Sequence, residues 1–404
     1  MQVKCIRQWE NLQLLKERWS ELAGDCPFRG WIWLSTWWKH YGCLRDDAPG
    51  DGAASLHHEL YVLLVFDDTP HQEEKCLGAS SRHVDLVKEK TPAQTLVAIA
   101  PCYLEQSFAR GRVLRLLGDG EVCSDHLSFL VDSQLPNQTP ILEALVNYLS
   151  QHVDDWDLLE FAGIEATDSV LAQIFDLMNK QGYQVQQSSG LQRWSVPLPE
   201  SWDLYLAQLS KSHRKQIRRL KRRVMETDRF VRHLVRSTGQ LELAWDRLVD
   251  LHQRRRNSLG EHGCFASARF ANFHRKVVEQ LWREEKLQLS WIELDGEPVA
   301  AEYVLAGNSA SYAYQSGLLP ERIAENPGQM SLICVIGQAI DSGHQQFDLL
   351  RGDEPYKAHW RAQPHATLDV QIVPPRTGAR WRYHSWSHFR QAGQWMRGVL
   401  RVES

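Results

Sequence analysis

The chain has 404 residues, a length that favours two domains over one. Hydrophobic residues make up 43% and charged residues 24%, a composition typical of a soluble globular protein, and no apolar run approaches the length of a membrane-spanning helix. The formal net charge of −4 excludes a general electrostatic attraction to nucleic acid or anionic lipid, so any basic site must be local.

The eight cysteines do not occur in pairs at the C-x-x-C spacing of zinc or redox sites. Because no signal peptide precedes them, we expect a cytoplasmic protein with reduced thiols. Cys123 and His126 lie close together in the sequence, but two further ligands are missing nearby. The sequence therefore predicts no metal site.

The first half of the chain is predicted to contain both helices and strands. Apolar residues at helix spacing predict helices within residues 9–41, with a break at 26–30. The Trp-rich block 31–38 predicts either packing of a helix on a sheet or a stacking platform for a sugar or base. The polar segment 71–94 predicts an insertion. Strands are expected at 59–66, 95–104, 112–117 and 125–131, followed by a helix at 139–152 and a strand at 156–163.

The second half contains the most regular stretch, residues 287–360. Two alternating runs joined by Asp295-Gly296 predict a β-hairpin, and an apolar helix is expected at 329–341. A short buried strand at 346–350 then opens into a polar loop, the place where an α/β sheet usually holds its ligand. Further helices are expected at 201–224, 241–258, 270–282 and 381–400, and further strands at 309–316 and 367–373.

Two similar segments indicate an internal duplication. Trp156-Asp157-Leu158-Leu159 and Phe347-Asp348-Leu349-Leu350 each follow a helix, and the elements that precede them match in order. We therefore expect an α/β protein with mixed sheets and two domains of one fold, at 1–199 and 200–375, followed by a basic helix at 376–404. That helix either docks on its own domain or makes a peripheral contact with a membrane surface.

One predicted helix is unusually rich in positive charge. A narrow apolar stripe is surrounded by basic side chains, and no acid lies between residues 211 and 223. Such a run is either a solvated face or a surface for an anionic partner, such as cofactor phosphate, a nucleotide-linked precursor, tRNA or membrane lipid. The basic residues are Lys211, His213, Arg214, Lys215, Arg218, Arg219, Lys221, Arg222 and Arg223.

Six segments follow one another within residues 204–360: LAQLSKSHRKQIRR, LVDLHQRRRNSLGEHGCF, IELDGEPVAAEYVL, AYQSG, NPGQMSL and FDLLRGDEPYKAHW. Their order resembles that of the BioF2-like, CelD/BcsL-type acetyltransferases, a branch of the GNAT superfamily related to the FemAB peptidyltransferases. In the first half, PF…WIWLSTWWKHYG and CSDHLSFLV resemble the first domain of the same proteins. The segment that ends in Tyr356-Lys357 is the most specific part of the resemblance.

The resemblance implies an α/β fold of tandem, duplicated GNAT-like domains that transfers an acyl group to an amine or hydroxyl. The implied donor is acyl-CoA, such as acetyl-CoA, and the implied acceptor is a saccharide or a cellulose, exopolysaccharide or cell-envelope precursor. In the Fem branch the donor is instead aminoacyl-tRNA. The Arg/Gln-x-x-Gly-x-Gly/Ala loop that holds the CoA pyrophosphate in GNAT enzymes is missing. The corresponding helix start carries Gly328, Gln329 and Met330, whose backbone N–H groups would suit a phosphate.

Acyl transfer needs a base for the acceptor, stabilisation of the oxyanion and a proton for the leaving group. Asp348, at the end of a buried strand, is predicted either as the base or as a residue that caps the following loop. Tyr356 is a candidate proton donor, and Lys357 a candidate positive charge for the oxyanion or a phosphate, as the Fem resemblance implies. Glu302 is a second candidate base, because a carboxylate on an apolar strand must face water or a cleft.

Four further residues are expected at an anion-binding edge for the substrate: His213, Arg214, His252 and Arg255. No Ser or Cys has a local nucleophile signature, so direct transfer is expected rather than a covalent acyl-enzyme. Three functions stay open at this point. They are an acyl-CoA-dependent acyltransferase, a Fem-like aminoacyl-tRNA-dependent transferase, and a non-catalytic scaffold of a polysaccharide-synthesis complex.

Overall fold

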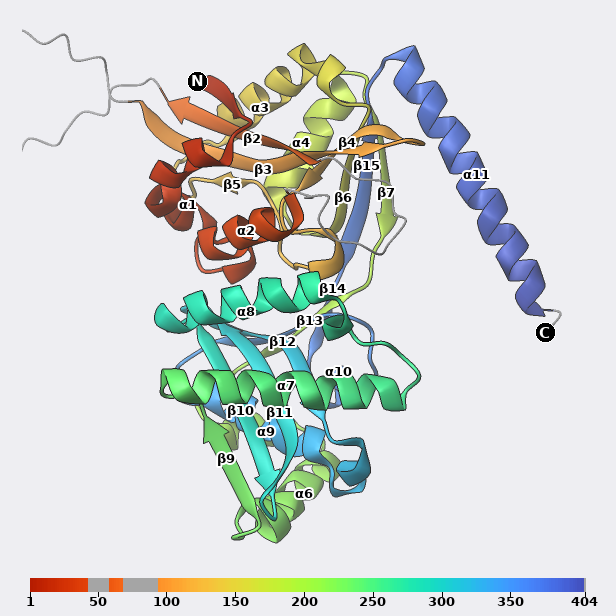
Figure 1. The fold of residues 1–404 in the computed structure, drawn as a ribbon. Helices are drawn as coiled ribbons and strands as arrows, with labels where there is room; N and C mark the ends of the chain where they lie inside the picture. Colours follow the sequence, from red (N-terminus) through yellow and green to blue (C-terminus); the bar gives the residue numbers. More distant parts are fainter. Residues whose placement is uncertain (43–57, 68–93, 403–404) are drawn as a thin grey trace, which may run out of the picture.

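Two mixed β-sheets, each with helices packed against it, organise the chain into an N-terminal lobe and a C-terminal lobe (Figure 1). The computed structural model describes residues 1–42, 58–67 and 94–402, with side chains up to residue 389. The insertion predicted at 71–94 lies outside these residues, apart from its last position.

The sheet of the N-terminal lobe has the order β1-β2-β3-β4-β6-β15-β7, and the two-residue strand β5 pairs with β3. All neighbours are antiparallel except β4 and β6, which are parallel. The strands are β1 (Gln2–Ile6), β2 (His58–Asp67), β3 (Thr95–Ser107), β4 (Gly111–Leu116), β5 (Leu130–Val131), β6 (Leu158–Glu165), β7 (Gln184–Ser189) and β15 (Thr367–Val373).

The sheet of the C-terminal lobe has the order β9-β10-β11-β12-β13-β8-β14. Here too every pair is antiparallel except one, β12 with β13. The strands are β8 (Arg193–Pro197), β9 (Phe230–Leu234), β10 (Leu287–Leu294), β11 (Glu297–Ala306), β12 (Ala310–Leu318), β13 (Gln346–Arg351) and β14 (Gln363–His365).

The helices follow the same order in the two lobes. In each lobe, helices lie between the first and second strands of the sheet, one helix joins the two parallel strands, and another follows the second of them. The α-helices are α1 (Lys16–Ala23), α2 (Trp31–Trp37), α3 (Thr139–Gln151), α4 (Ser169–Lys180), α5 (Trp202–Gln208), α6 (Lys211–Leu220), α7 (Thr238–Ser258), α8 (Ala268–Arg283), α9 (Pro327–Asp341), α10 (Tyr356–His359) and α11 (Thr377–Val402). This repeated arrangement is the one expected from the internal duplication.

The lobes exchange one strand each. β8 precedes residue 200 in the chain yet lies inside the C-terminal sheet, between β13 and β14. Conversely, β15 lies inside the N-terminal sheet, between β6 and β7. The division at 1–199 and 200–375 remains a prediction for the domains, but the sheets cross it at these two strands.

An aromatic cluster joins the two lobes. α2 packs against α8, so that Trp33 makes an edge contact with Phe273 at a centroid distance of 5.2 Å. Phe28, before α2, contacts Tyr312 of β12 at 5.7 Å. Trp33, Phe28 and Phe273 are fully buried. The Trp-rich block is therefore part of the core, which agrees with the packing alternative.

Most of the predicted hairpin, helix and strand elements are present, but two predictions in this group are wrong. The strand expected at 125–131 is reduced to β5, because Cys123 and His126 have left-handed backbone angles, with φ of 48° and 60°. The helix expected at 201–224 is divided, because Leu209 is extended and the Ser210 hydroxyl caps a new helix by accepting from the His213 N–H. Seven elements have no counterpart among the predicted ones: α4, α10, β1, β7, β8, β9 and β14.

The C-terminal helix α11 begins against the N-terminal sheet and extends away from it (Figure 1). Ala379 and Tyr383 are buried against β15 and its neighbours, while Trp381 on the helix is 74% exposed. No helix in the described part of the chain is long and apolar enough to cross a membrane.

A carboxylate of the N-terminal lobe anchors a turn of the C-terminal lobe. Asp25 accepts hydrogen bonds from the N–H of Asn308, from the N–H of Ser309 at 2.9 Å and from the Ser309 hydroxyl at 2.8 Å. Burial raises the pKa of Asp25, but these hydrogen bonds outweigh burial and hold the pKa below its ordinary value of 3.8.

We predict that Asp25→Ala lowers the free energy of unfolding by about 2 kcal/mol at pH 7, because charge-assisted hydrogen bonds between the lobes are lost. A lowered pKa stabilises the fold above the unfolded-state pKa, and the stabilisation is lost as the pH falls through the folded-state value. Urea denaturation should therefore show that the free energy of unfolding differs between the wild type and Asp25→Ala at pH 7. This difference should become smaller below about pH 4.

Asp176→Ala provides the matched control. Asp176 is an exposed carboxylate on α4 with no hydrogen bond or ion pair to the described residues. Its removal should change stability by less than about 0.5 kcal/mol. An equal loss in both variants, or a loss in Asp25→Ala that does not depend on pH, would contradict the proposed anchor.

Candidate functional site

A cavity of about 790 Å³ lies where the parallel strands β12 and β13 separate. The two strands pair only from Ala310 to Tyr312, opposite Gln346 to Asp348. Beyond this point the rest of β12 and residues 349–351 of β13 form two walls of the cavity. The edge of β12 that faces the opening has no ladder partner there, so its backbone N–H and C=O groups can meet a ligand.

Glu302 is the buried carboxylate of this cavity, whose wall also includes the exposed Glu354. Glu302 lies on β11, is only 6% exposed, and accepts a hydrogen bond of 2.6 Å from the Ser331 hydroxyl on α9. Burial raises the pKa of Glu302 to about 7, although the hydrogen bond from Ser331 acts in the opposite direction. The group can therefore take up or release a proton near neutral pH.

The cavity wall at Leu350 is a strained backbone segment. Leu350 has a φ of 58°, a conformation that a bulky side chain disfavours, and the ladder between β13 and β8 is irregular from Asp348 to Arg351. Asp348 Oδ1 accepts from the Leu350 N–H at 2.8 Å, and Lys357 Nζ donates to the Leu350 carbonyl at 3.1 Å. These two side chains fix the bulge.

Lys357 is almost fully buried, although it is a cation. Its Nζ also donates to the carbonyls of Arg351 and Gly352, and it forms an ion pair with Glu354 at 2.9 Å. Because an ammonium group has three N–H donors, none remains free for an oxyanion in this geometry. The arrangement supports a positioning role for Lys357, and its predicted contact with substrate charge remains a prediction.

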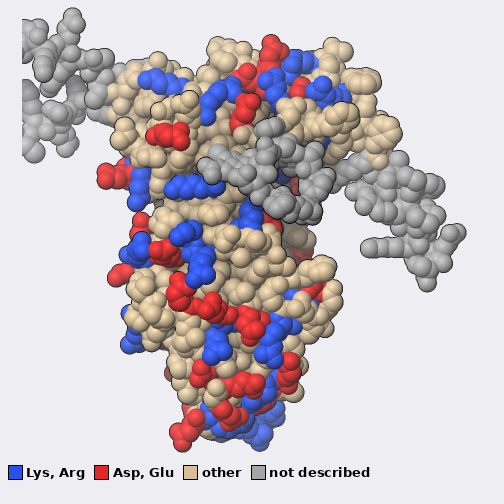
Figure 2. All heavy atoms as spheres, in the orientation of Figure 1, with Lys and Arg blue, Asp and Glu red and all other residues tan. Residues whose placement is uncertain are grey.

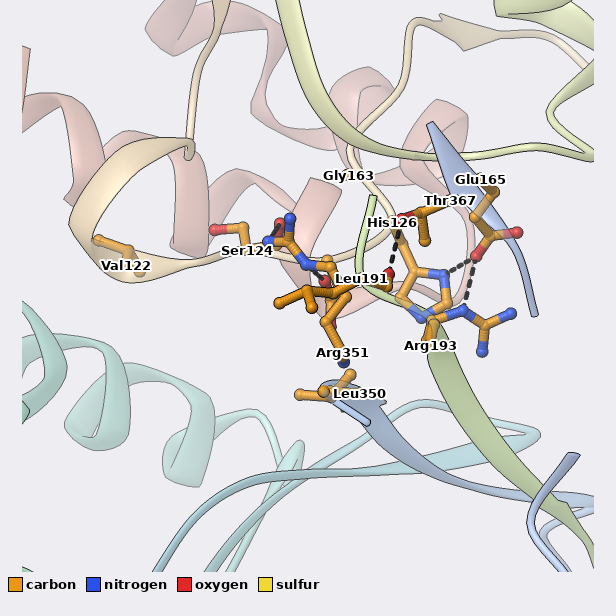
Figure 3. Close-up of polar contacts among 12 residues, drawn as sticks. Val122, Ser124, His126, Gly163, Glu165, Leu191, Arg193, Leu350, Arg351 and Thr367 are labelled. Atoms are coloured by element: carbon orange, nitrogen blue, oxygen red, sulfur yellow. Dashed lines mark hydrogen bonds and ion pairs between the residues drawn. The ribbon is translucent and has the colours of Figure 1, made fainter. Parts of the chain in front are cut away.

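Asp348 does not line the cavity. Its side chain is fully buried between the lobes, where Oδ2 is 2.5 Å from Arg193 Nη1 and 3.0 Å from His126 Nε2. His126 Nδ1 and Arg193 Nε both contact Glu165 of β6, as Figure 3 shows for three of the four residues. The predicted role of Asp348 as a general base has no support in this position, whereas its alternative role, holding the following loop, agrees with it.

His126 is a buried cation in this network. Burial alone lowers the pKa of the imidazole, but hydrogen bonds to Asp348 and Glu165 outweigh burial and raise it to about 10. Burial raises the pKa of Glu165, and the contacts with His126 and then with Arg193 lower it to about 2. At neutral pH two cations therefore face two carboxylates across the lobe boundary, and no metal is needed to satisfy His126.

A second link joins the same loop to the cavity wall. Asp125 is buried and accepts from the backbone N–H of Arg351 at 2.8 Å, and its carboxylate also contacts Arg351 Nε. Arg351 Nη2 donates to the Ser124 carbonyl at 3.0 Å (Figure 3). The loop 123–126 of the N-terminal lobe thus holds both ends of the bulge in β13.

The structure brings only some of the predicted site residues into the cavity. The cavity wall includes Glu302, Tyr356, Lys357, Gly328, Gln329 and His213. The residues placed elsewhere are Asp348, Met330, Arg214, His252 and Arg255. Among them, Met330 is fully buried in the core. His252 forms hydrogen bonds with the Gln253 side chain and the Cys264 sulfur. Arg256, next to Arg255 on α7, lines the cavity instead.

The start of α9 offers fewer backbone donors than expected. Pro327 has no N–H, and the N–H groups of Gln329 and Met330 both donate to the Asn326 carbonyl. In this described turn, only the Gly328 N–H has no partner. A pyrophosphate bound at this helix end would therefore receive a single backbone hydrogen bond.

The start of α6, which the sequence did not single out, faces the same cavity. Ser210, Ser212 and His213 line the cavity, and the N–H groups of Lys211 and Ser212 have no backbone or side-chain partner among the described residues. A helix N-terminus combines free N–H groups with a positive partial charge. The cap formed by Ser210 was the signal that could have located it.

We predict that Asp348→Ala lowers the free energy of unfolding by about 3–5 kcal/mol, because Arg193 and His126 are left as buried, underpaired cations. Asp341→Ala removes an exposed carboxylate at the end of α9 and should cost less than about 0.5 kcal/mol. Denaturant unfolding monitored by tryptophan fluorescence measures the free energy of unfolding of both variants. A stable Asp348→Ala protein without transfer activity would instead favour the base role.

Comparisons with known proteins agree with this geometry. Residues 211–358 match the family model of the acetyltransferase (GNAT) domain. The crystal structure of FemX superposes with a TM-score of 0.56 at 10% identity, over 92% of this chain and 97% of that one. A conserved protein of unknown function from Bacteroides thetaiotaomicron VPI-5482 superposes with a TM-score of 0.50 at 8% identity, over 89% and 97% of the two chains.

A tandem GNAT protein from the clavulanic acid biosynthesis pathway gives a TM-score of 0.41 at 8% identity, over 93% of this chain and all of that one. The curated proteins contain no sequence match. At such identities the likeness to FemX concerns the fold alone. The predicted fold class, α/β with two mixed sheets, is confirmed, and residues 211–358 match the model of the acetyltransferase (GNAT) domain.

Proposed function

We propose that the cavity between β12 and β13 catalyses direct transfer of an acyl group to an amine or hydroxyl, with Glu302 as the general base. The observation that carries the proposal is a buried carboxylate with a pKa near 7 inside the cavity of the GNAT domain. Glu302 takes the proton of the acceptor as the acceptor attacks the acyl carbonyl. The unpaired edge of β12 offers backbone N–H groups to the developing oxyanion.

Tyr356 is the proposed proton donor to the leaving group. It lies at the cavity wall on α10, and burial, followed by the nearby charge of Glu354, raises the pKa of its phenol above the ordinary value of 10. The phenol is therefore protonated at neutral pH and can donate. With a thioester donor, the leaving thiolate would receive this proton, while the proton of the acceptor stays on Glu302.

The proposed donor is an acyl-CoA, bound with its phosphates toward the start of α6. The start of α6 has two N–H groups without a partner, those of Lys211 and Ser212, and it suits an anion better than the single free N–H at Gly328. The acceptor that we infer from the sequence resemblance is a saccharide or a precursor of exopolysaccharide, cellulose or the cell envelope.

The basic surface of α6 favours aminoacyl-tRNA as a second candidate donor. The eight Lys and Arg side chains from Lys211 to Arg223 form no ion pair with any described residue, and together they extend for about 20 Å from the cavity. Figure 2 shows basic side chains, mixed with acidic ones, at the end of the C-terminal lobe where Figure 1 places α6. A row of this length exceeds what the phosphates of one CoA need.

We predict that Glu302→Gln lowers kcat/KM for acyl transfer by about a hundredfold or more, because the amide cannot accept the proton. In the wild-type protein the rate should rise with an apparent pKa near 7, since Glu302 must be ionised. Ser331→Ala removes a hydrogen bond that lowers this pKa, so its profile should move to higher pH. A profile that is unchanged in Ser331→Ala would argue against Glu302 as the base.

The donor can be identified from salt dependence. With aminoacyl-tRNA, replacing Arg218, Arg219, Arg222 and Arg223 by Gln should reduce activity strongly and flatten a steep fall with ionic strength. With an acyl-CoA donor, the same variant should keep most of its activity and show a shallow salt dependence. Activity with neither donor, and no thermal stabilisation by either, would favour a non-catalytic scaffold over both transferase functions.

A further inference from the structure

The N-terminal lobe contains a second cavity, of about 580 Å³, which shares no lining residue with the cavity around Glu302. It is lined by α1, by the segment 126–134, and by the chain at the end of β6 and the start of α4. Its location follows from the duplicated fold. Gln138, the residue before α3, lines it, just as Asn326, the residue before α9, lines the first cavity.

The acidic groups of this second cavity already have partners. Glu165 contacts His126 and Arg193, and the pair Glu21 and Asp132 contacts Arg18. The remaining carboxylate, Asp168, caps α4 by accepting from the Leu171 N–H at 2.9 Å. Each acid therefore has a closer partner, and none of them forms an ion pair or hydrogen bond with a further cation in the wall.

Arg29 is that further cation. Its guanidinium has no hydrogen bond or ion pair with the described residues, and its Nε is buried without a partner. The backbone around it is fixed, because Arg29 ends a helical turn and its carbonyl accepts from Trp19 Nε1 at 3.0 Å. In the adjoining network, His126 and Arg193 contact Glu165 and Asp348 directly. The charge of Arg29 acts on Glu165 without forming an ion pair, so its guanidinium donors stay available to a ligand.

We propose that Arg29 and the wall around it bind the anionic group, a carboxylate or a phosphate ester, of a small hydroxylated ligand. A partly buried guanidinium is costly without a partner, and its planar donors match the oxygens of both groups. The rest of the wall is mixed, with apolar residues such as Leu22, Phe129 and Val131 beside residues that carry hydroxyl or amide groups, namely Ser128, Ser133, Gln134, Thr167 and Ser169. Such groups suit the hydroxyls of a sugar acid or sugar phosphate.

This site is independent of the transfer reaction proposed above, since it lies in the other lobe and uses none of the same residues. Binding can therefore be measured on the full chain without any acyl donor. Glu302→Gln, which should abolish transfer, should leave binding at Arg29 unchanged. Failure of one proposal is thus distinguishable from failure of the other.

The test is isothermal titration calorimetry of the full chain with glucuronate, glucose 6-phosphate and glucose at constant ionic strength. Saturable binding of at least one anionic sugar, with glucose at least about tenfold weaker, supports the proposal. Binding of glucuronate but not glucose 6-phosphate would identify a carboxylate site. Binding of glucose 6-phosphate but not glucuronate would identify a phosphate site. If neither anion binds more tightly than glucose, the proposal is overturned.

Two variants assign the binding to Arg29. Arg29→Gln should lower the affinity for the preferred anion by at least about tenfold, and Arg29→Lys should recover part of this affinity. Lys180→Gln removes an exposed cation from the end of α4 in the same lobe and should leave the affinity unchanged. Equal affinity in wild type and Arg29→Gln would overturn the assignment. If Arg29→Gln fails to fold, two measurements still test the proposal: the affinity of the wild type for the anionic sugars compared with glucose, and the affinity of Arg29→Lys for the preferred anion.

Discussion

The molecule depends on a buried charge network that crosses the boundary between its lobes. His126 and Glu165 belong to the N-terminal sheet and its loop, Arg193 lies on the exchanged strand β8, and Asp348 lies on β13. Removing such groups from water is unfavourable unless every charge has a close partner, and here each charge has at least one. The network therefore fixes the relative orientation of the two lobes.

This relative orientation determines the shape of the cavity around Glu302. Asp348 fixes the backbone of Leu350 from one side, and Asp125 fixes that of Arg351 from the other. Leu350 keeps its left-handed backbone conformation because Asp348 and Asp125 hold the backbone on both sides of it. The N-terminal lobe thus contributes to the GNAT domain without placing a side chain in the part of the cavity that holds Glu302. The two lobes share a fold, but the first cavity contains the buried carboxylate of Glu302, and the second contains Arg29, whose guanidinium forms no ion pair with the described residues.

The sequence predicted local features better than those that depend on distant partners. The hairpin at Asp295-Gly296 and the strand around Phe347 follow from alternation and turn chemistry, so they were recognisable. Glu302 was recognisable because an acid on an apolar strand needs a cleft or a partner. For Asp348 only the loop-capping alternative was recognisable. Its ion pairs were not, since its partner His126 lies 222 residues away in the sequence. Arg29 had no local signal at all.

The strand exchange has a consequence for how the chain is made. β15 occupies an internal position of the N-terminal sheet, between β6 and β7, yet it is synthesised after every strand of the C-terminal sheet. While the ribosome is still adding residues 200–366, that sheet has a gap with unpaired strand edges on both sides. The first lobe therefore cannot complete its sheet until the strands of the second lobe have been made, and the nascent protein must protect an open sheet while residues 200–366 are added.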